Sequence, residues 1–268
     1  MTFGGGLFIR RAFVDLFCNF YYNIGMFEEF ARSEAFFGRE QMQKLYNAKA
    51  ALFGVGGVGG WCAEALARSG VGGIDLFDGD AVSLSNINRQ AIALHSTIGR
   101  QKAEVMAERI RDIYSAAEVR AFDMFVDGGN IGEIDFSRYD IVLDAIDTVS
   151  SKVLIIERAV RAGIPVISCM GAGNKLDISL FRAADISKTS VCPLARAVRS
   201  ALKKVGIYSG VTAIFSTEQP RQILVDEGRS SRHIPASNAF APAAAGLALA
   251  REAVLKIMAR EDEDDSSR

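Results

Sequence analysis

Two residue types that enzymes often use for catalysis or metal binding are scarce in this sequence of 268 residues. It contains two histidines and four cysteines: His95, His233, Cys18, Cys62, Cys169 and Cys192. Two histidines leave little material for histidine-based catalysis or for a histidine metal site. The cysteines form no CxxC pair, which excludes the kind of zinc site that two such pairs build. Because the cysteines follow no even disulfide framework either, we expect a reducing, cytoplasmic compartment.

Long apolar runs and a charge excess are also lacking. No apolar run reaches the roughly 18–20 residues that a membrane-spanning helix needs, so we expect no stable transmembrane association. The net charge of −1 shows no global basic bias, so any contact with nucleic acid must be a local patch. One candidate is the predicted helix at 193–205, whose basic residues recur at spacings of three and four. A solvated helix face is the alternative interpretation.

What the sequence does contain is a glycine-rich turn. An apolar run at 49–53 leads directly into the turn, and helix-forming residues follow at 61–69. The glycines are Gly54, Gly56, Gly57 and Gly59. Glycine permits backbone angles that a Cβ would block, and it lets phosphates approach N–H groups at the positive end of a helix. The pattern therefore predicts a nucleotide-binding turn.

Asp78 ends the next apolar run, about 20 residues past the turn, where a dinucleotide-binding fold places its ribose-binding carboxylate. Up to this point a nicotinamide or flavin enzyme would look the same. The following residues favour a triphosphate: Asp80, Asn86 and Arg89 share one loop, and Lys102 begins the next predicted helix. Departing pyrophosphate accumulates negative charge, which arginine and lysine stabilise. Ordinary surface charge explains Arg89 or Lys102 alone, but it explains the whole spaced set poorly.

A further buried strand, predicted at 139–144, ends in the acidic segment 144–147. Acidic side chains at the carboxyl end of a parallel strand lie over the ligand crevice. We therefore expect Asp147 to hold a Mg²⁺ ion that bridges phosphate oxygens. For Asp144, a loop or capping role is an equally good interpretation.

Strands and helices alternate through residue 170, which predicts an α/β fold with a Rossmann-like, doubly wound, mainly parallel sheet. The predicted strands are 49–54, 73–77, 117–122, 139–144 and 165–170, and the predicted helices are 58–69, 99–114, 127–133 and 149–162. After this repeat we expect added strands at 177–182 and 210–215, the helix at 193–205 between them, and a final helix at 242–259.

The spaced motifs GxGGxG, DxDxVxxSNxxRQ and GxxK, followed by the strand-end aspartate, resemble those of the ubiquitin-activating-enzyme-like adenylyltransferases. The resemblance implies that Asp78 holds the ribose of ATP and that Asn86, Arg89 and Lys102 face its phosphates, with Asp80 beside them. It also implies that Asp147 binds Mg²⁺. We expect a ThiF-like ATP-binding adenylation domain at 26–260 and an acidic, disordered tail at 261–268. We interpret residues 1–25 as an extension from an upstream, non-native start, with a targeting segment as the alternative.

Further segments, among them FARSEAFFG, GAGNKLD and FSTE, resemble the tRNA-modifying dehydratases of this family. That resemblance implies ATP-dependent dehydration, by cyclisation, of threonylcarbamoyladenosine in tRNA, after adenylation of its carboxylate. The alternative is adenylation of the C-terminus of a ubiquitin-like sulfur carrier, although such activators usually carry two CxxC pairs. A nicotinamide oxidoreductase and a non-catalytic nucleotide-binding module also remain open. Arg89, Lys102 and Asp147 argue against both.

The family resemblance also implies partners. These are the tRNA substrate, a sulfur-transfer protein, and a second copy of the chain in a homodimer. In that dimer, Arg32 of the FARSEAFFG segment would complete the ATP site of the other subunit and act in catalysis. A surface or interface ion pair is the alternative role for Arg32.

Overall fold

The computed structural model describes residues 27–221 and 236–260, so the predictions for 1–25 and 261–268 lie outside the described residues. The chain divides into two compact units at residues 44 and 45. The first unit contains the 3₁₀ turn Glu28–Phe30, helix α2 (Ala31–Phe37) and most of helix α3 (Arg39–Asn47). Gly38 separates the two helices with a φ of 86°, a left-handed value that favours glycine. The sequence analysis did not predict these helices.

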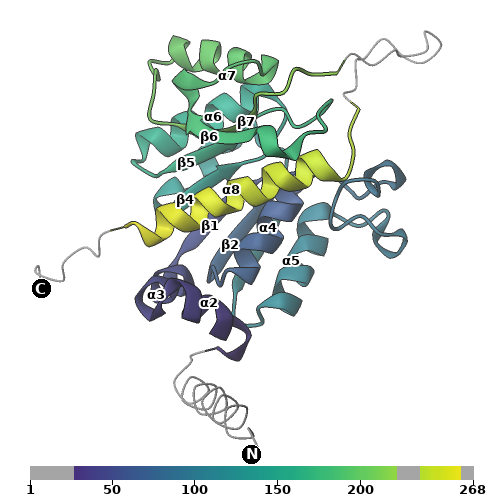
Figure 1. Ribbon diagram of the computed structural model, residues 1–268, viewed down its shortest axis with the longest axis vertical. Helices are drawn as coiled ribbons and strands as arrows, with labels where there is room; N and C mark the ends of the chain where they lie inside the picture. The colour runs from purple at the N-terminus through teal and green to yellow at the C-terminus, as the bar shows by residue number, and fades with distance from the viewer. Residues whose placement is uncertain (1–26, 222–235, 261–268) are drawn as a thin grey trace, which may run out of the picture. The chain divides into compact units, whose positions relative to one another are not determined.

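The second unit is built on a sheet whose seven described strands follow the order β3-β2-β1-β4-β5-β7-β6 (Figure 1). Their bounds are β1 Lys49–Phe53, β2 Gly73–Phe77, β3 Glu118–Phe122, β4 Ile141–Asp144, β5 Val166–Cys169, β6 Phe181–Asp185 and β7 Thr212–Ser216. Neighbouring strands are parallel except β6, which pairs antiparallel with β7. The predicted doubly wound sheet with added strands is confirmed. Because the strand order reverses between β1 and β4, their carboxyl ends form the switch point where such sheets bind ligands.

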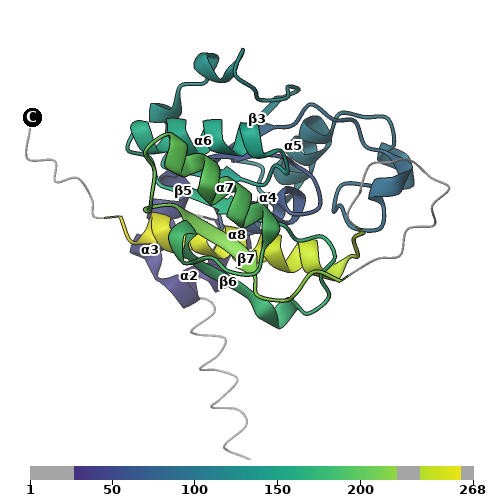
Figure 2. The same ribbon diagram turned by 90° about the horizontal axis from the view of Figure 1, so that it is seen from above.

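Helices cover both faces of the sheet: α4 Gly59–Arg68, α5 Lys102–Ile113, α6 Val149–Arg161, α7 Pro193–Lys204 and α8 Phe240–Met258. α4 packs against α5 and α8, whereas α6 packs against α7 (Figures 1 and 2). The contact between α4 and α8 is close, because a Cβ on Gly246 would lie 2.3 Å from the Val58 carbonyl oxygen. In the described part of the chain, no helix is long and apolar enough to cross a membrane.

An aromatic ladder supports the carboxyl ends of the first three strands. Phe53, Phe77 and Phe122 are the last residues of β1, β2 and β3, and they lie in register across the sheet. Neighbouring rings stack with centroids 4.5 Å apart. Such cross-strand aromatic pairs stabilise a sheet beyond the burial of their area. The ladder therefore provides a rigid base beneath the switch point.

Two local predictions were wrong. The helix expected at 127–133 is only a 3₁₀ turn, Ile131–Glu133. The Asn130 side chain accepts the N–H of Asp127 and donates to the carbonyl of Phe125, and such local bonds compete with a helix. The strand expected at 177–182 begins at Phe181, because the Asp177 carboxylate caps a 3₁₀ turn ahead of it.

Candidate functional site

A cleft of about 960 Å³ lies at the carboxyl ends of the parallel strands, across the switch point. It brings together most of the predicted site residues: Gly54, Gly56, Gly57, Asp78, Asp80, Asn86, Arg89, Lys102 and Asp147. The lining continues past β4 to the loop that follows β5. One continuous space therefore connects the glycine turn with the added C-terminal part of the sheet.

The glycines of the turn serve two different purposes. Gly54 has a φ of 87°, and a Cβ on Gly59 would lie 1.8 Å from the Gly54 carbonyl oxygen. These two glycines therefore allow the turn to close on itself. Gly56 and Gly57 line the cleft, and a Cβ on Gly56 would have only the Gln90 side chain within 4 Å, at 3.8 Å. The backbone of Gly56 is thus open to a ligand just before α4, at the positive end of the helix, whereas a Cβ on Gly57 would lie 3.2 Å from the side chain of Pro242.

The Asp78 carboxylate ties the end of β2 to the glycine turn. One oxygen accepts the N–H of Val55 at 2.6 Å, and the other accepts the N–H of Asp80 at 2.9 Å. Burial raises the pKa of Asp78, although these two N–H groups and the nearby Lys102 ammonium oppose the shift. An ionised carboxylate oxygen accepts more than one hydrogen bond, so a ribose hydroxyl could still donate to Asp78.

Lys102 is held at the cleft by Asp80. The Lys102 Nζ lies 2.6 Å from Asp80 Oδ2, and the side chain of Lys102 is 7% exposed while that of Asp80 is 54% exposed. The backbone N–H of Lys102 also donates to the carbonyl of Asp80, which fixes the start of α5. The predicted position of Lys102 in the first helical turn is confirmed. Its ammonium is therefore held in a fixed position at the cleft.

The loop between β2 and α5 positions Arg89. The Asn86 side-chain oxygen accepts the N–H of Ser83, and the backbone carbonyl of Asn86 accepts the N–H of Arg89. The Arg89 guanidinium donates to the Ser85 carbonyl at 2.9 Å and to Asn88 Oδ1 at 2.8 Å. Within residues 27–221 and 236–260, no carboxylate pairs with Arg89. Its charge is therefore oriented by neutral acceptors and left available to an anion.

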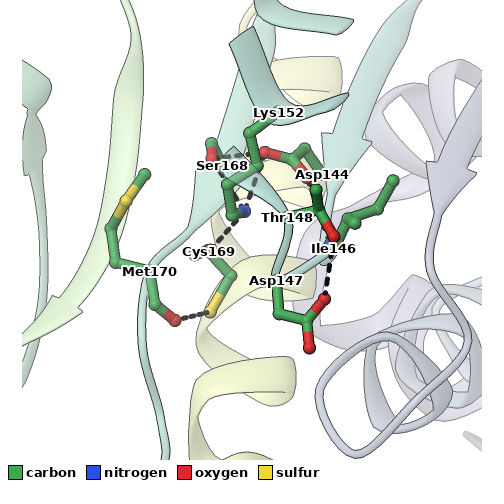
Figure 3. A network of polar contacts seen from close by, with 8 residues as sticks. All are labelled: Asp144, Ile146, Asp147, Thr148, Lys152, Ser168, Cys169 and Met170. Atoms are coloured by element: carbon green, nitrogen blue, oxygen red, sulfur yellow. Dashed lines mark hydrogen bonds and ion pairs between the residues drawn. The ribbon is translucent and has the colours of Figure 1, made fainter. Parts of the chain in front are cut away.

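Figure 3 shows that Asp144, the last residue of β4, and Asp147, three residues later, differ in environment. Asp144 is fully buried; its Oδ2 lies 2.9 Å from Lys152 Nζ and accepts a bond of 2.5 Å from the Ser168 hydroxyl. Lys152 also donates to the Cys169 carbonyl at 2.7 Å, so it joins α6 to the ends of β4 and β5. Asp147 is exposed, with the Thr148 hydroxyl 3.4 Å away. Asp144 thus joins α6 to the sheet, whereas the carboxylate of Asp147 is exposed at the cleft.

These features agree with the comparisons to known proteins. The sequence profile of the ThiF family matches residues 30–267. The chain belongs to the ThiF family. The family expected from the sequence is confirmed.

One relative within the ThiF family is the tRNA threonylcarbamoyladenosine dehydratase of Bacillus subtilis, 42% identical over 87% of this chain and 96% of that protein. The crystal structure of the Escherichia coli tRNA N6-threonylcarbamoyladenosine dehydratase in complex with ATP superposes with a TM-score of 0.76. It is 36% identical and covers 87% of this chain and 94% of that chain. The sulfur carrier protein ThiS adenylyltransferase of Bacillus subtilis is 32% identical over only 53% of this chain and 44% of that protein. The similarity to the dehydratases is thus much more extensive.

Sequence reasoning missed several polar groups of this ThiF-family cleft. Lys152 and Lys175 are buried, although a lysine in a polar or helical segment is normally expected to be exposed. Gln90 Oε1 and Asn174 Oδ1 are buried without a hydrogen-bond partner in the described residues, and both residues line the cleft. GAGNKLD, part of the resemblance, contains Asn174 and Lys175, and this was the signal that could have pointed to them.

Other predicted groups are exposed or have structural roles. Arg32 is exposed on α2, in the N-terminal unit. On α7, Arg199 donates to the Thr189 carbonyl at 2.9 Å and to its hydroxyl, so it is not a free cation. Arg196, Lys203 and Lys204 remain exposed. The basic face of α7 is therefore smaller than its sequence indicates.

Proposed function

We propose that this chain catalyses the ATP-dependent dehydration of threonylcarbamoyladenosine in tRNA. The observation that carries the proposal is the continuous cleft, in which a glycine turn and two fixed cations lead past Asp147 to the loop after β5. In outline, the modification's carboxylate attacks the α-phosphate of ATP, and pyrophosphate leaves. A group of the same modification then attacks the acyl adenylate, the ring closes, and AMP leaves. The ring closure is intramolecular and needs no protein nucleophile.

The nucleotide half of the cleft supplies the first step. Asp78 accepts the ribose hydroxyls, and the N–H groups of Gly56 and Gly57 receive phosphate oxygens. Arg89 and Lys102 stabilise the charge that develops as pyrophosphate departs. Because both cations are already held by hydrogen bonds, little reorganisation is needed when that charge appears.

Asp147 fits a magnesium site of the kind that nucleotide phosphates complete. Within the described residues, no cluster of three or more His, Cys, Asp and Glu could hold a metal ion by itself. Mg²⁺ in nucleotide enzymes is bound by one or two carboxylates together with phosphates and waters, which suits an exposed aspartate at the cleft. The ion would supply charge stabilisation at the phosphates.

The test of this function is incubation of the purified protein with ATP, Mg²⁺ and tRNA that carries the threonylcarbamoyl group. We expect AMP and pyrophosphate to form while the modified nucleoside loses the mass of one water. Release of ADP would contradict the adenylation step. Adenylation of a ubiquitin-like sulfur carrier, with the modified tRNA unchanged, would establish the alternative function.

The active unit in this proposal is a homodimer in which Arg32 of one subunit faces the phosphates of the other. A third cation would neutralise more of the leaving pyrophosphate's charge and would make catalysis depend on assembly. Arg32→Ala and Asp147→Ala should each be inactive alone, whereas mixed subunits should regain activity because one site then carries both lesions. If subunits exchange and activity does not return, Arg32 does not act across the interface. The sulfur-transfer partner and the cytoplasmic location remain predictions.

A further inference from the structure

Lys175 is a buried lysine in the half of the cleft that the nucleotide residues do not use. Lys175 is 3% exposed, and it lies on the loop after β5, next to Asn174. Both residues line the cleft. Neither adenylation nor the binding of phosphates, as described above, assigns a role to them.

Nζ of Lys175 pairs with no carboxylate in the described part of the chain. Its Nζ donates to the backbone carbonyl of Glu218. The Glu218 carboxylate is occupied elsewhere: it accepts the N–H groups of Leu176 and Asp177, each at 2.9 Å, and it lies 3.8 Å from the Arg221 guanidinium. Lys152, by contrast, pairs directly with the Asp144 carboxylate. Burial without such a pair favours the neutral amine.

Burial and the groups that face Lys175 change its pKa in opposite directions. Burial lowers the pKa of Lys175, and the nearby Cys192 and Glu218 oppose this only in part. The N–H of Leu176, with smaller contributions from Asp177, Lys175 and Arg221, lowers the pKa of Glu218 against the effect of desolvation. Glu218 therefore remains a carboxylate, while Lys175 gives up its proton more easily than an exposed lysine does.

Asn174 gives a second, independent indication that this loop receives a ligand. Its φ of 59° lies in the left-handed region, and its Oδ1 is buried without a partner among the described residues. The loop is held in place from both sides, because the N–H of Asn174 donates to the Ala236 carbonyl and its own carbonyl accepts the N–H of Arg221. A buried acceptor that lacks a partner is costly unless a donor arrives.

The order of the strands places this loop where the acyl group must lie. Asp78 follows β2, the glycine turn follows β1, Asp147 follows β4, and Lys175 follows β5. Since the sheet order is β2-β1-β4-β5, a nucleotide that spans the first three positions directs its α-phosphate toward the fourth. The acyl group on that phosphate then extends toward Asn174 and Lys175.

We propose that Lys175, as the neutral amine, is the general base for ring closure. The carbamoyl group links two nitrogens, and its cyclisation requires the loss of one N–H proton. As the new bond to the acyl carbon forms, the bond from that carbon to the AMP oxygen breaks and the proton moves to Lys175 Nζ, which later returns it to solvent. Asn174 Oδ1 accepts an N–H group of the substrate and orients it. This inference rests on the proposed function.

The first experiment separates the two steps in single turnovers, with Lys175→Met, Lys175→Arg and wild-type enzyme. Pyrophosphate release reports adenylation, and the loss of water from the nucleoside reports ring closure. We expect both variants to form pyrophosphate at the wild-type rate but to close the ring about a hundredfold more slowly. The exposed Lys256→Ala is the matched control and should equal wild type.

Arginine keeps the positive charge but cannot act as a base near neutral pH. If Lys175→Arg closes the ring at the wild-type rate, Lys175 acts as a cation and the proposal is wrong. If either variant loses pyrophosphate release together with ring closure, the proposal is also wrong, because Lys175 then serves adenylation or tRNA binding. If wild type leaves modified tRNA unchanged, it is the proposed function that fails.

The second experiment is chemical rescue of Lys175→Ala with methylamine. A base role predicts that rescue of ring closure follows the concentration of free amine and therefore increases with pH. In wild type, the rate should fall as the pH drops through the pKa of Lys175, whereas the rate of Lys175→Met should not. Rescue that follows the methylammonium concentration, or a wild-type pH profile shared by Lys175→Met, would overturn the proposal.

Discussion

Lys102 and Lys175 are both buried at the cleft, but their surroundings differ. Lys102 lies 2.6 Å from the carboxylate of Asp80, whereas Lys175 donates to a backbone carbonyl. The nucleotide half thus holds cations that are already oriented, Lys102 by a carboxylate and Arg89 by neutral acceptors, as electrostatic stabilisation of a leaving group requires. The half after β5 holds a buried lysine without a carboxylate partner in the described residues, and each half holds one buried amide oxygen without a partner there, Gln90 Oε1 and Asn174 Oδ1. The difference between the two lysines fits the proposal that one half of the cleft binds phosphate charge and the other accepts a proton.

The glycine turn gives the most severe test of the nucleotide half. Gly59→Ala should abolish ATP binding, because its Cβ would lie 1.8 Å from the Gly54 carbonyl oxygen and the turn could not close. Such overpacking also costs about 1–3 kcal/mol of stability. The neighbouring Gly60→Ala is the control, since its Cβ would meet nothing closer than 3.8 Å. Calorimetric titration with ATP measures the affinity of both variants. Equal affinities of Gly59→Ala and Gly60→Ala for ATP would show that the turn is not the phosphate site.

Asp147→Ala tests the boundary between the two halves. We expect the adenylation rate to fall about 10³-fold with little change in ATP affinity, because Mg²⁺ matters most as charge develops. Asp112→Ala, an exposed carboxylate on α5, is the control and should leave the rate unchanged. Pyrophosphate release at increasing Mg²⁺ measures the effect. A wild-type rate would remove Asp147 from the metal site.

The two buried lysines after β4 should differ in their contribution to stability. Lys152→Met leaves the fully buried Asp144 carboxylate unpaired and should cost about 3–5 kcal/mol of unfolding free energy. Lys175→Met removes one hydrogen bond to a carbonyl and should cost roughly 1 kcal/mol. Urea unfolding of both variants measures the difference. Equal losses would mean that Lys175 has an ionic partner, and the contrast between the halves would fail.

Charge reversal on α7 should affect tRNA binding only, and by less than the changes above affect adenylation or stability. Lys203→Glu should raise the KM for tRNA and reduce the salt dependence of binding by a slope of about 1 if the lysine meets a phosphate. Arg199→Glu is unsuitable for this purpose, because Arg199 is bonded to Thr189 and its loss would disturb the fold. An unchanged KM and salt slope for Lys203→Glu would make this helix face a solvated one.

Substitution of the two cysteines at the cleft, Cys169 and Cys192, should change the dehydratase activity least. Burial raises the pKa of Cys169 to about 12, so almost no thiolate exists near neutral pH. Cys169→Ser and Cys192→Ser should each retain most of the dehydratase activity, and iodoacetamide should react slowly with Cys169 in the folded protein. A thioester trapped on either cysteine would contradict a reaction without a protein nucleophile.

Most of the nucleotide half could be predicted because its residues lie close together in the chain. The glycines, Asp78, Arg89 and Lys102 have fixed spacings on one strand–turn–helix unit and the loop that follows it. Local geometry therefore links each residue to the next. The short segment 127–133 was misjudged because two hydrogen bonds of the Asn130 side chain outweigh helix propensity there.

The sequence by itself determined the alternation of strands and helices, the glycine turn and the acidic strand ends, since hydrophobic period and backbone freedom are local properties. Only the tertiary structure decided which charges are paired. Asp144 and Lys152 meet because α6 packs over β4 and β5, and Arg199 is bonded because α7 lies against the segment before it. Lys175 is buried because the backbone of residue 218 reaches it across 43 positions of the chain. Burial and pairing depend on such distant contacts, which no local pattern encodes.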